Sequence, residues 1–285
     1  MELILANPTG FCFGVTRAIK ELENSLDTFG KVYSIGSPIH NPQEVKRLEE
    51  KGLVVVRSAE EIPHGSVVFV RAHGEMPDAL KTVRQKALLI IDGTCPFVHN
   101  AQEKAKFLLD EGYDLFIVGD PEHPEVKAIL GAVNNRGTVI NDVQTLNSYS
   151  SLNRCGIISQ TTQSKDFLGS VVSALIPVCN EMRVYNTICK ATLERQDAIR
   201  QLASMVDGLI IIGGKNSANT SQLSRIAVQE NISTLWIEDS EELEPCWFEG
   251  KTIIGIAAGA STPDWLINKI KLSLEHRKSE GDGKL

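Results

Sequence analysis

The 285-residue sequence lacks any apolar run of the roughly 18–20 residues that a membrane-spanning helix requires, and we therefore expect no membrane partner. Its amino terminus has no cationic leader of the secretory type, so we expect a cytoplasmic protein. Positive charge is scarce, because 29 Lys and Arg face 36 Asp and Glu, for a net charge of −7. This acidic balance argues against nucleic acid as a partner, and an aromatic content of 6% offers no stacking platform for bases.

Several familiar cofactor motifs are also missing. The first strand–helix turn carries no G-x-G-x-x-G, and the chain contains neither H-E-x-x-H nor a paired C-x-x-C. Gly213-Gly214-Lys215 resembles the end of a phosphate loop, but Asn216 stands where that motif requires Ser or Thr. The sequence thus gives no support to a nicotinamide-binding or ATP-binding fold.

What the sequence does contain is a regular alternation of short Val- and Ile-rich runs with segments of helical period, the pattern of parallel α/β units. It predicts twelve strands in three sets of four: Leu3–Ala6, Val32–Ile35, Leu53–Val56, Val67–Val70, Leu88–Ile91, Leu115–Val118, Thr138–Ile140, Gly156–Ser159, Arg183–Ile188, Leu209–Ile212, Thr234–Ile237 and Thr252–Ala257.

Three cysteines mark an internal repeat. Cys12, Cys95 and Cys189 each follow a strand and directly precede an amphipathic helix, and they lie 83 and 94 residues apart. We expect three α/β domains related by pseudo-threefold symmetry, each with a mostly parallel four-stranded sheet, arranged as a closed ring. Their predicted bounds are 14–95, 96–189 and 190–285. The last is one strand short, so the N-terminal strand (residues 1–13) is expected to complete it.

Each unit also carries two polar turns after its strands, where parallel α/β folds place their binding sites. The first turns contain His40, His123 and Ser217 with Asn219; the second contain His73, Thr161 with Thr162, and Ser261. Helix starts of this kind bind anions, and the candidate donors to a diphosphate are His40, His73, His123, Ser217, Asn219 and Ser261. Glu125 lies at one such turn and is a candidate proton donor, provided that burial raises its pKa.

The three repeated cysteines are candidate metal ligands, because a helix N-terminus favours thiolate over thiol. Three thiolates converging on one centre are typical of an iron–sulfur cluster or of a zinc ion, and the residues alone leave both open. Without a secretion signal, six cysteines favour metal or redox chemistry over a disulfide framework. Cys155, Cys179 and Cys246 occupy no repeated position and are interpreted as structural.

A series of motifs recurs in the order of one known family. They are Phe11-Cys12-Phe13-Gly14-Val15, Ile39-His40-Asn41, Ala72-His73-Gly74, Thr94-Cys95-Pro96, His123-Pro124-Glu125-Val126, Gln160-Thr161-Thr162, Ile188-Cys189-Lys190-Ala191-Thr192, Lys215-Asn216-Ser217 with Asn219, and Ala258-Gly259-Ala260-Ser261. As a set, over residues 1 to about 270, they closely resemble the 4-hydroxy-3-methylbut-2-enyl diphosphate reductases of the non-mevalonate isoprenoid pathway.

The resemblance implies an oxidoreductase built as a trefoil of three α/β domains around a central [4Fe–4S] cluster, in which Cys12, Cys95 and Cys189 each bind one iron and the fourth iron stays open. It places Glu125 as the proton source, Thr161 as its relay partner and His123 beside them. The implied substrate contacts are His40, His73, His123, Thr161, Thr162, Thr192, Ser217, Asn219 and Ser261. The implied substrate is an allylic diphosphate, and a ferredoxin or flavodoxin would donate the electrons.

Two positions depart from the family pattern: Ala218 stands where many relatives carry a second serine, and Phe13 replaces a smaller residue beside Cys12. Neither departure removes a proposed ligand or catalytic group. Three alternatives remain from the residues: an iron–sulfur hydro-lyase acting on a small diphosphate, a cluster-based redox sensor without catalysis, and a zinc site.

Overall fold

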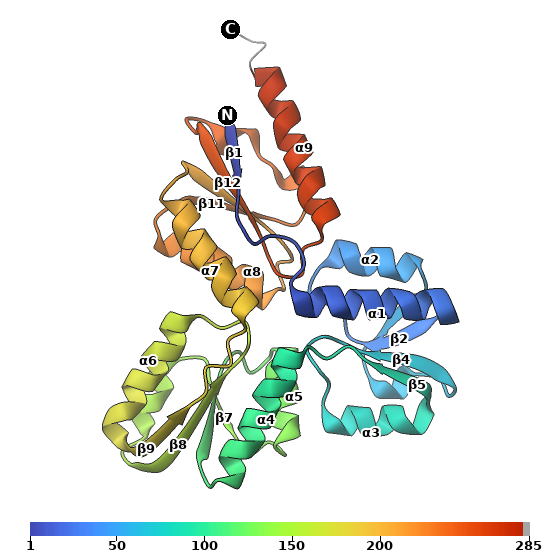
Figure 1. The fold of residues 1–285 in the computed structure, drawn as a ribbon, viewed down its shortest axis with the longest axis vertical. Helices are drawn as coiled ribbons and strands as arrows, with labels where there is room; N and C mark the ends of the chain where they lie inside the picture. The colour runs from blue at the N-terminus through green and yellow to red at the C-terminus, as the bar shows by residue number, and fades with distance from the viewer. Residues whose placement is uncertain (282–285) are drawn as a thin grey trace. The chain divides into compact units, whose positions relative to one another are not determined.

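The computed structural model describes residues 1–281 of the chain, and within them the strands form three four-stranded sheets, all of whose pairings are parallel (Figure 1). The predicted α/β class with three parallel sheets is confirmed. No helix among these residues is both long and apolar enough to cross a membrane. By internal contacts the chain divides into two compact units, which are described separately.

The first, which we call the terminal unit, comprises Met1–Phe13, His40–Glu44 and the chain from Lys190 onward. Its strands are β1 (Glu2–Leu5), β10 (Gly208–Ile212), β11 (Ser233–Ile237) and β12 (Ile253–Ala258), in the order β1-β12-β10-β11. Its helices are α7 (Lys190–Ala203), α8 (Ala218–Gln229) and α9 (Asp264–Gly281), with short 3₁₀ turns at Ser240–Glu242 and Pro245–Phe248. The N-terminal strand β1 pairs with β12, Leu3 opposite Ile254.

Two layers of apolar side chains hold this sheet between helices. Ile199 and Leu202 of α7 pack with Leu223 of α8 against one face, together with Leu209 of β10. The opposite face is covered by α9, whose fully buried Leu266 and Ile270 belong to a second cluster. Strands buried on both faces are rich in Val and Ile throughout rather than alternating, which is why β10 reads Gly-Leu-Ile-Ile-Ile.

The middle unit, Gly14–Ile39 with Val45–Cys189, contains the other two sheets. One has the order β3-β2-β4-β5, from β2 (Val32–Ile35), β3 (Leu53–Val56), β4 (Ser66–Val70) and β5 (Ala87–Asp92). The other has the order β7-β6-β8-β9, from β6 (Asp114–Val118), β7 (Thr138–Ile140), β8 (Leu152–Ser159) and β9 (Cys179–Val184).

Six α-helices of the described residues surround these sheets. They are α1 (Phe13–Phe29), α2 (Pro42–Glu50), α3 (Pro77–Lys86), α4 (Pro96–Asp110), α5 (Pro124–Ala132) and α6 (Lys165–Leu175), with 3₁₀ turns at Ala59–Glu61, Val143–Ser148 and Ile176–Val178. The first positions of α3, α4 and α5 are prolines, whose fixed φ suits a helix start and whose missing N–H costs nothing there. As expected, α4 buries Val98, Ala101, Ala105 and Leu108.

One strand was predicted at the wrong place. β9 begins at Cys179 and ends at Val184, whereas the apolar pattern had placed it at Arg183–Ile188. As an edge strand β9 is half exposed, so its Cys-Asn-Glu-Met sequence carries no continuous apolar signal. Beyond it the chain is held by the Thr187 hydroxyl, which donates to the Ser159 carbonyl and accepts from the Ser159 N–H at 2.8 Å.

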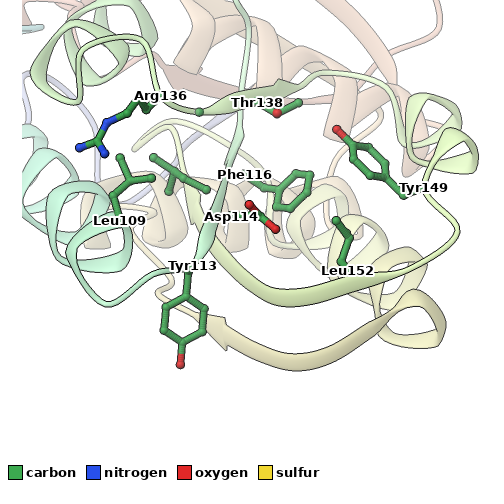
Figure 2. Close-up of a pocket in the computed structure, with 10 residues that line it drawn as sticks. Leu109, Tyr113, Asp114, Phe116, Arg136, Thr138, Tyr149 and Leu152 are labelled. Carbon is green, nitrogen blue, oxygen red and sulfur yellow. The ribbon is translucent and has the colours of Figure 1, made fainter.

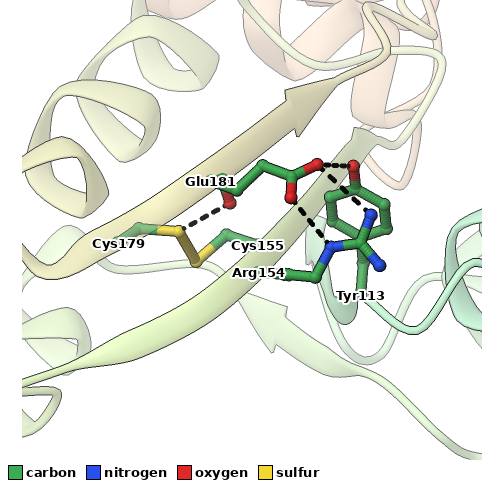
Figure 3. The surroundings of a disulfide bond; sticks show 5 residues. All are labelled: Tyr113, Arg154, Cys155, Cys179 and Glu181. Carbon is green, nitrogen blue, oxygen red and sulfur yellow. Dashed lines mark hydrogen bonds and ion pairs between the residues drawn. A yellow bond between two sulfur atoms is a disulfide. The ribbon is translucent and has the colours of Figure 1, made fainter.

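Two of the cysteines outside the repeat form a disulfide, a pairing that the sequence analysis did not predict. Cys155 of β8 and Cys179 of β9 are joined by a disulfide, and beside it Glu181 accepts hydrogen bonds from Arg154 and Tyr113 (Figure 3). The composition could not reveal this pair, because the pairing depends on the position of β9. Cys246 is exposed rather than buried as a structural residue.

Candidate active site

Each of the three repeated cysteines donates an equivalent backbone hydrogen bond. The N–H of Cys12 donates to the Ala260 carbonyl at 3.0 Å, that of Cys95 to Ala72 at 2.9 Å, and that of Cys189 to Thr161 at 3.0 Å. Each acceptor lies in a second polar turn and directly precedes one of the candidate binding residues, which are Ser261, His73 and Thr162. The repeat read from the sequence thus holds at the level of single hydrogen bonds.

None of these three cysteines belongs to a disulfide, and each is half-buried. Cys95 lies against α1 of the same unit: a Cβ added to Gly14 would stand 2.5 Å from its Sγ, so only glycine leaves room for the sulfur. Cys95 directly precedes α4 and Cys189 directly precedes α7, where a helix N-terminus stabilises negative sulfur. These three cysteines are therefore the candidate ligands for a soft metal.

In the middle unit, the candidate acid Glu125 is fully buried at the start of α5. Its Oε1 accepts the backbone N–H of Thr161 at 2.6 Å, and its Oε2 accepts the Thr161 hydroxyl at 2.8 Å. Burial raises the pKa of this carboxyl to about 7, and the two hydrogen bonds from Thr161 offset only part of that rise. Glu125 is therefore poised to carry and release a proton near neutral pH.

Two histidines lie beside Glu125. His123 caps α5, since its Nδ1 accepts the Glu125 N–H at 3.2 Å, and its side chain is buried. The ring of His73 meets that of His123 edge-on, with their centroids 5.5 Å apart. The structure thus brings together His73, His123, Glu125 and Thr161, residues drawn from three separate turns.

Gln160 links two of these turns. Its Oε1 accepts the Asp120 N–H at 3.1 Å, and its Nε2 donates to the Thr162 hydroxyl at 2.8 Å. Gln160 is itself buried, so the amide fixes the rotamer of Thr162 relative to the turn that leads to His123. Gln160 therefore holds Thr162 in position, a role that the sequence motifs did not assign.

The terminal unit holds the remaining candidate residues. The Ser261 hydroxyl donates to the His40 carbonyl at 3.1 Å, and Gly214 approaches the same carbonyl so closely that an added Cβ would stand 2.6 Å from it. Asn219 is buried, and its Oδ1 accepts the N–H of Ala260, the neighbour of Ser261, at 2.9 Å. His40, Ser261 and Asn219 thus gather at one edge of this sheet.

Asn219 supplies the clearest sign of a ligand in this unit. Its Nδ2 is buried and has no hydrogen-bond partner among residues 1–281, whereas its Oδ1 is satisfied. A buried unpaired donor costs about 1–3 kcal/mol, and an anionic oxygen would supply the missing acceptor. Ser217 caps α8 by accepting the Thr220 N–H at 3.3 Å, and Thr192 is buried in the first turn of α7.

Two cavities lie within the middle unit. One of about 270 Å³ lies at the carboxyl ends of β4 and β5 and is lined by Gly74, Thr94 and His99, next to His73 and Cys95. The other, about 360 Å³, lies at the amino ends of β6–β8, away from those turns. Figure 2 shows Asp114 and Phe116 between Arg136 on one side and Tyr149 on the other. No motif in the sequence pointed to this second cavity.

Two arginines that the sequence motifs missed, Arg17 and Arg195, reach the cysteine loops. Arg195 is buried although it is charged, and no sequence motif included it. One available signal was the adjacent Gln196, which lies with Arg195 next to the apolar face of that helix and is also buried.

Comparisons with known proteins all indicate one family. The model of the LytB protein family matches residues 3–275. The 4-hydroxy-3-methylbut-2-enyl diphosphate reductase of Aquifex aeolicus is 44% identical over 279 residues, covering 96% of each chain. The protein of the same name from Geobacter metallireducens is 42% identical, with 95% of each chain covered.

Solved structures give the same result. A structure described as (E)-4-hydroxy-3-methyl-but-2-enyl diphosphate reductase, the terminal enzyme of the non-mevalonate pathway, is 43% identical, with a TM-score of 0.71 over 97% of this chain and 100% of that one. The E-1-hydroxy-2-methyl-but-2-enyl-4-diphosphate reductase of Plasmodium falciparum is 27% identical, with a TM-score of 0.89 over 95% of this chain and 87% of that one. The chain therefore belongs to the LytB family of diphosphate reductases.

Proposed function

We propose that this chain catalyses the two-electron reductive dehydration of 4-hydroxy-3-methylbut-2-enyl diphosphate to isopentenyl and dimethylallyl diphosphate. Two electrons and two protons enter. The allylic C–O bond breaks, and the hydroxyl leaves as water with one of the protons. The other proton forms a new C–H bond on the allyl group. The reductase name of relatives more than 40% identical over nearly the whole chain supports this assignment.

The proposed cofactor is a [4Fe–4S] cluster bound by Cys12, Cys95 and Cys189. The donor set fits: three thiols outside any disulfide, held by equivalent backbone hydrogen bonds, suit iron or another soft metal. With three protein ligands, such a cluster supplies electrons one at a time and an open iron that acts as a Lewis acid on the substrate hydroxyl.

We assign proton delivery to Glu125. The observation that carries this assignment is a fully buried carboxyl with a pKa of about 7, both of whose oxygens are hydrogen-bonded to Thr161. A carboxyl with that pKa is protonated in about half of the molecules at neutral pH, so it can protonate the departing oxygen. Thr161 orients it and relays the proton, and His123 at the start of the same helix lies beside it.

We assign substrate binding to His40, His73, His123, Thr161, Thr162, Thr192, Ser217, Asn219 and Ser261. Most are uncharged donors, and a hydrogen bond to a charged group contributes about 1.5–3 kcal/mol, so several together hold a diphosphate without an arginine cluster. The unsatisfied Nδ2 of Asn219 is the strongest support for an anion at these turns. Such anchoring keeps the allylic end in place for the reaction.

The proposal extends to the cell. We infer a cytoplasmic enzyme that takes single electrons from a ferredoxin or a flavodoxin, because the reaction consumes two electrons from an external donor. A hydro-lyase would need no electrons, and a redox sensor would need no Glu125. A zinc protein would be colourless.

Anaerobic turnover of the diphosphate substrate, with and without a low-potential one-electron reductant, tests the proposal. The reductase requires the reductant and releases the two C5 diphosphates. Water loss without reductant would support the hydro-lyase, and a colourless preparation with stoichiometric zinc would overturn the cluster assignment.

A further inference from the structure

Helix α1, which follows Cys12, carries a side chain that holds the loop of Cys95. Arg17 donates from Nη1 to the Thr94 carbonyl at 3.2 Å and from Nη2 to the Asp92 carbonyl at 3.3 Å. Thr94 directly precedes Cys95 in the sequence. The guanidinium therefore binds two backbone carbonyls of the segment that directly precedes Cys95.

Helix α7, which follows Cys189, repeats this arrangement in the terminal unit. Arg195 donates from Nη2 to the Gly10 carbonyl at 2.7 Å, two residues before Cys12, and from Nη1 to the Ala191 carbonyl of its own helix at 3.1 Å. Arg195 is only 3% exposed. Burying a guanidinium is costly, so the fold places this charge beside the Cys12 loop against a substantial desolvation penalty.

The third helix of the repeat, α4, also places a cation against the segment before a cysteine, but through a weaker contact. Lys104 of α4, the helix that follows Cys95, lies over the ring of Tyr185 with its Nζ 4.7 Å from the centroid. Tyr185 stands four residues before Cys189. In each case, a cation on the helix that follows one cysteine contacts the segment that leads into another cysteine.

We propose that Arg17 and Arg195 are positioning residues for the cysteine ligands, and that their charges also raise the reduction potential of the bound cluster. This inference rests on the proposed function, because it concerns the cluster that those cysteines would hold. Arg17 fixes the backbone before Cys95 at two carbonyls, and Arg195 ties the backbone before Cys12 to helix α7. Each guanidinium makes its two contacts from two fixed nitrogens, which a lysine cannot do with a single ammonium.

The charge effect follows from simple electrostatics. A cluster with three thiolates gains one negative charge when it accepts an electron, and a nearby cation stabilises the more negative form. The effect is expected to be larger for Arg195, since burial keeps its guanidinium away from bulk water. Arg17 is about one-third exposed, and its Nε pairs with Glu21 at 3.0 Å, which cancels part of its field.

The test replaces each arginine in the full-length protein by methionine, which keeps most of the apolar stem, and by lysine, which keeps the charge. The matched controls are Arg200→Met on α7, whose guanidinium pairs with surface carboxylates at 3.6–3.8 Å, and Lys20→Met on α1, an exposed residue. Two readouts independent of turnover are iron and acid-labile sulfide content after anaerobic reconstitution, and the midpoint of a titration followed by electron paramagnetic resonance.

For Arg195→Met, we expect reduced iron content and a more negative midpoint, by at least tenfold in the one-electron equilibrium, or about 59 mV. Arg195→Lys should recover most of the midpoint but not all of the iron. Arg17→Met should lower the iron content and the midpoint potential by smaller amounts. Neither control variant should change the iron content or the midpoint potential. If Arg195→Met does not fold, Arg17→Met and Arg195→Lys decide by the same measurements.

Methionine variants with the iron content and midpoint of the unchanged protein would overturn the inference while leaving the proposed function intact. An unchanged protein that takes up no iron and sulfide would instead refute the proposed function itself. The iron and sulfide content of the unsubstituted protein therefore distinguishes the two failures.

Discussion

Thr161 donates to both oxygens of Glu125, through its N–H at 2.6 Å and through its hydroxyl at 2.8 Å. The same residue accepts the N–H of Cys189 at 3.0 Å through its carbonyl. One residue thus links the candidate proton donor to the loop of a candidate cluster ligand. A displacement of the Cys189 loop would therefore reach the Glu125 carboxyl through the hydrogen bonds of Thr161.

Replacing Glu125 by glutamine should abolish proton delivery while leaving the shape of the buried site intact. We expect turnover to fall by about 10²–10⁴-fold, the usual contribution of a general acid. Iron and sulfide content should stay at the level of the unchanged protein. The matched control is Glu122→Gln, an exposed carboxylate paired with Lys127 at 2.7 Å, which should retain turnover. Full activity in the Glu125 variant would remove this residue from the mechanism.

Thr161→Val removes the hydroxyl but keeps the backbone N–H. Glu125 loses one of the two hydrogen bonds that favour its anion, so its pKa should rise above 7 by about one unit, equivalent to about 1.4 kcal/mol. Because the protonated form is the active one, the decline of turnover at alkaline pH should move to higher pH. Thr161→Ser keeps a hydroxyl and should restore the original profile. A pH–rate profile that is the same in all three proteins would contradict the assignment.

The raised pKa of Glu125 also makes a prediction about stability. A carboxyl whose pKa is about 7 when folded and near 4.5 when unfolded favours the folded state below pH 4.5, and that advantage is lost as pH rises toward 7. Relative to Glu125→Gln, the unchanged protein should therefore lose up to about 3 kcal/mol of unfolding free energy across this window. Urea denaturation of both proteins at matched cluster loading, from pH 4.5 to 8, measures the difference. A constant difference would show that the carboxyl does not titrate as described.

The sequence predicts much of this architecture, and the places where it fails have physical causes. Buried parallel strands such as β10 are apolar on both faces and stand out, and the polar residues at their carboxyl ends indicate the site edge. The edge strand β9 is half exposed and carries no such pattern. Arg195 was missed for a different reason, because its partner, the Gly10 carbonyl, lies 185 residues away in the sequence. Likewise, the hydrogen bonds of the three cysteine N–H groups could not be predicted, because each acceptor carbonyl is far from its cysteine in the sequence. The three domain boundaries remain predictions.

The Cys155–Cys179 disulfide predicts a simple thiol count. After anaerobic removal of metal and unfolding without reductant, four of the six cysteines should titrate, and all six should titrate once a reductant is added. Because the bridge closes a loop of sequence separation 24, Cys179→Ser should cost roughly 3 kcal/mol of unfolding free energy under oxidising conditions. Cys246→Ser, an exposed control, should lower each count by one without that loss. Six reactive thiols in the unreduced protein would contradict the pairing.

The measurement that tests the central claim most directly is a Mössbauer spectrum of the anaerobically purified, ⁵⁷Fe-labelled protein, recorded with and without the hydroxylated C5 diphosphate. The account predicts four irons per chain, of which one alone changes its isomer shift and quadrupole splitting when the diphosphate is added, because only that iron lacks a cysteine among Cys12, Cys95 and Cys189. Four irons with identical parameters, unaffected by the diphosphate, or a protein without iron and sulfide, would contradict it.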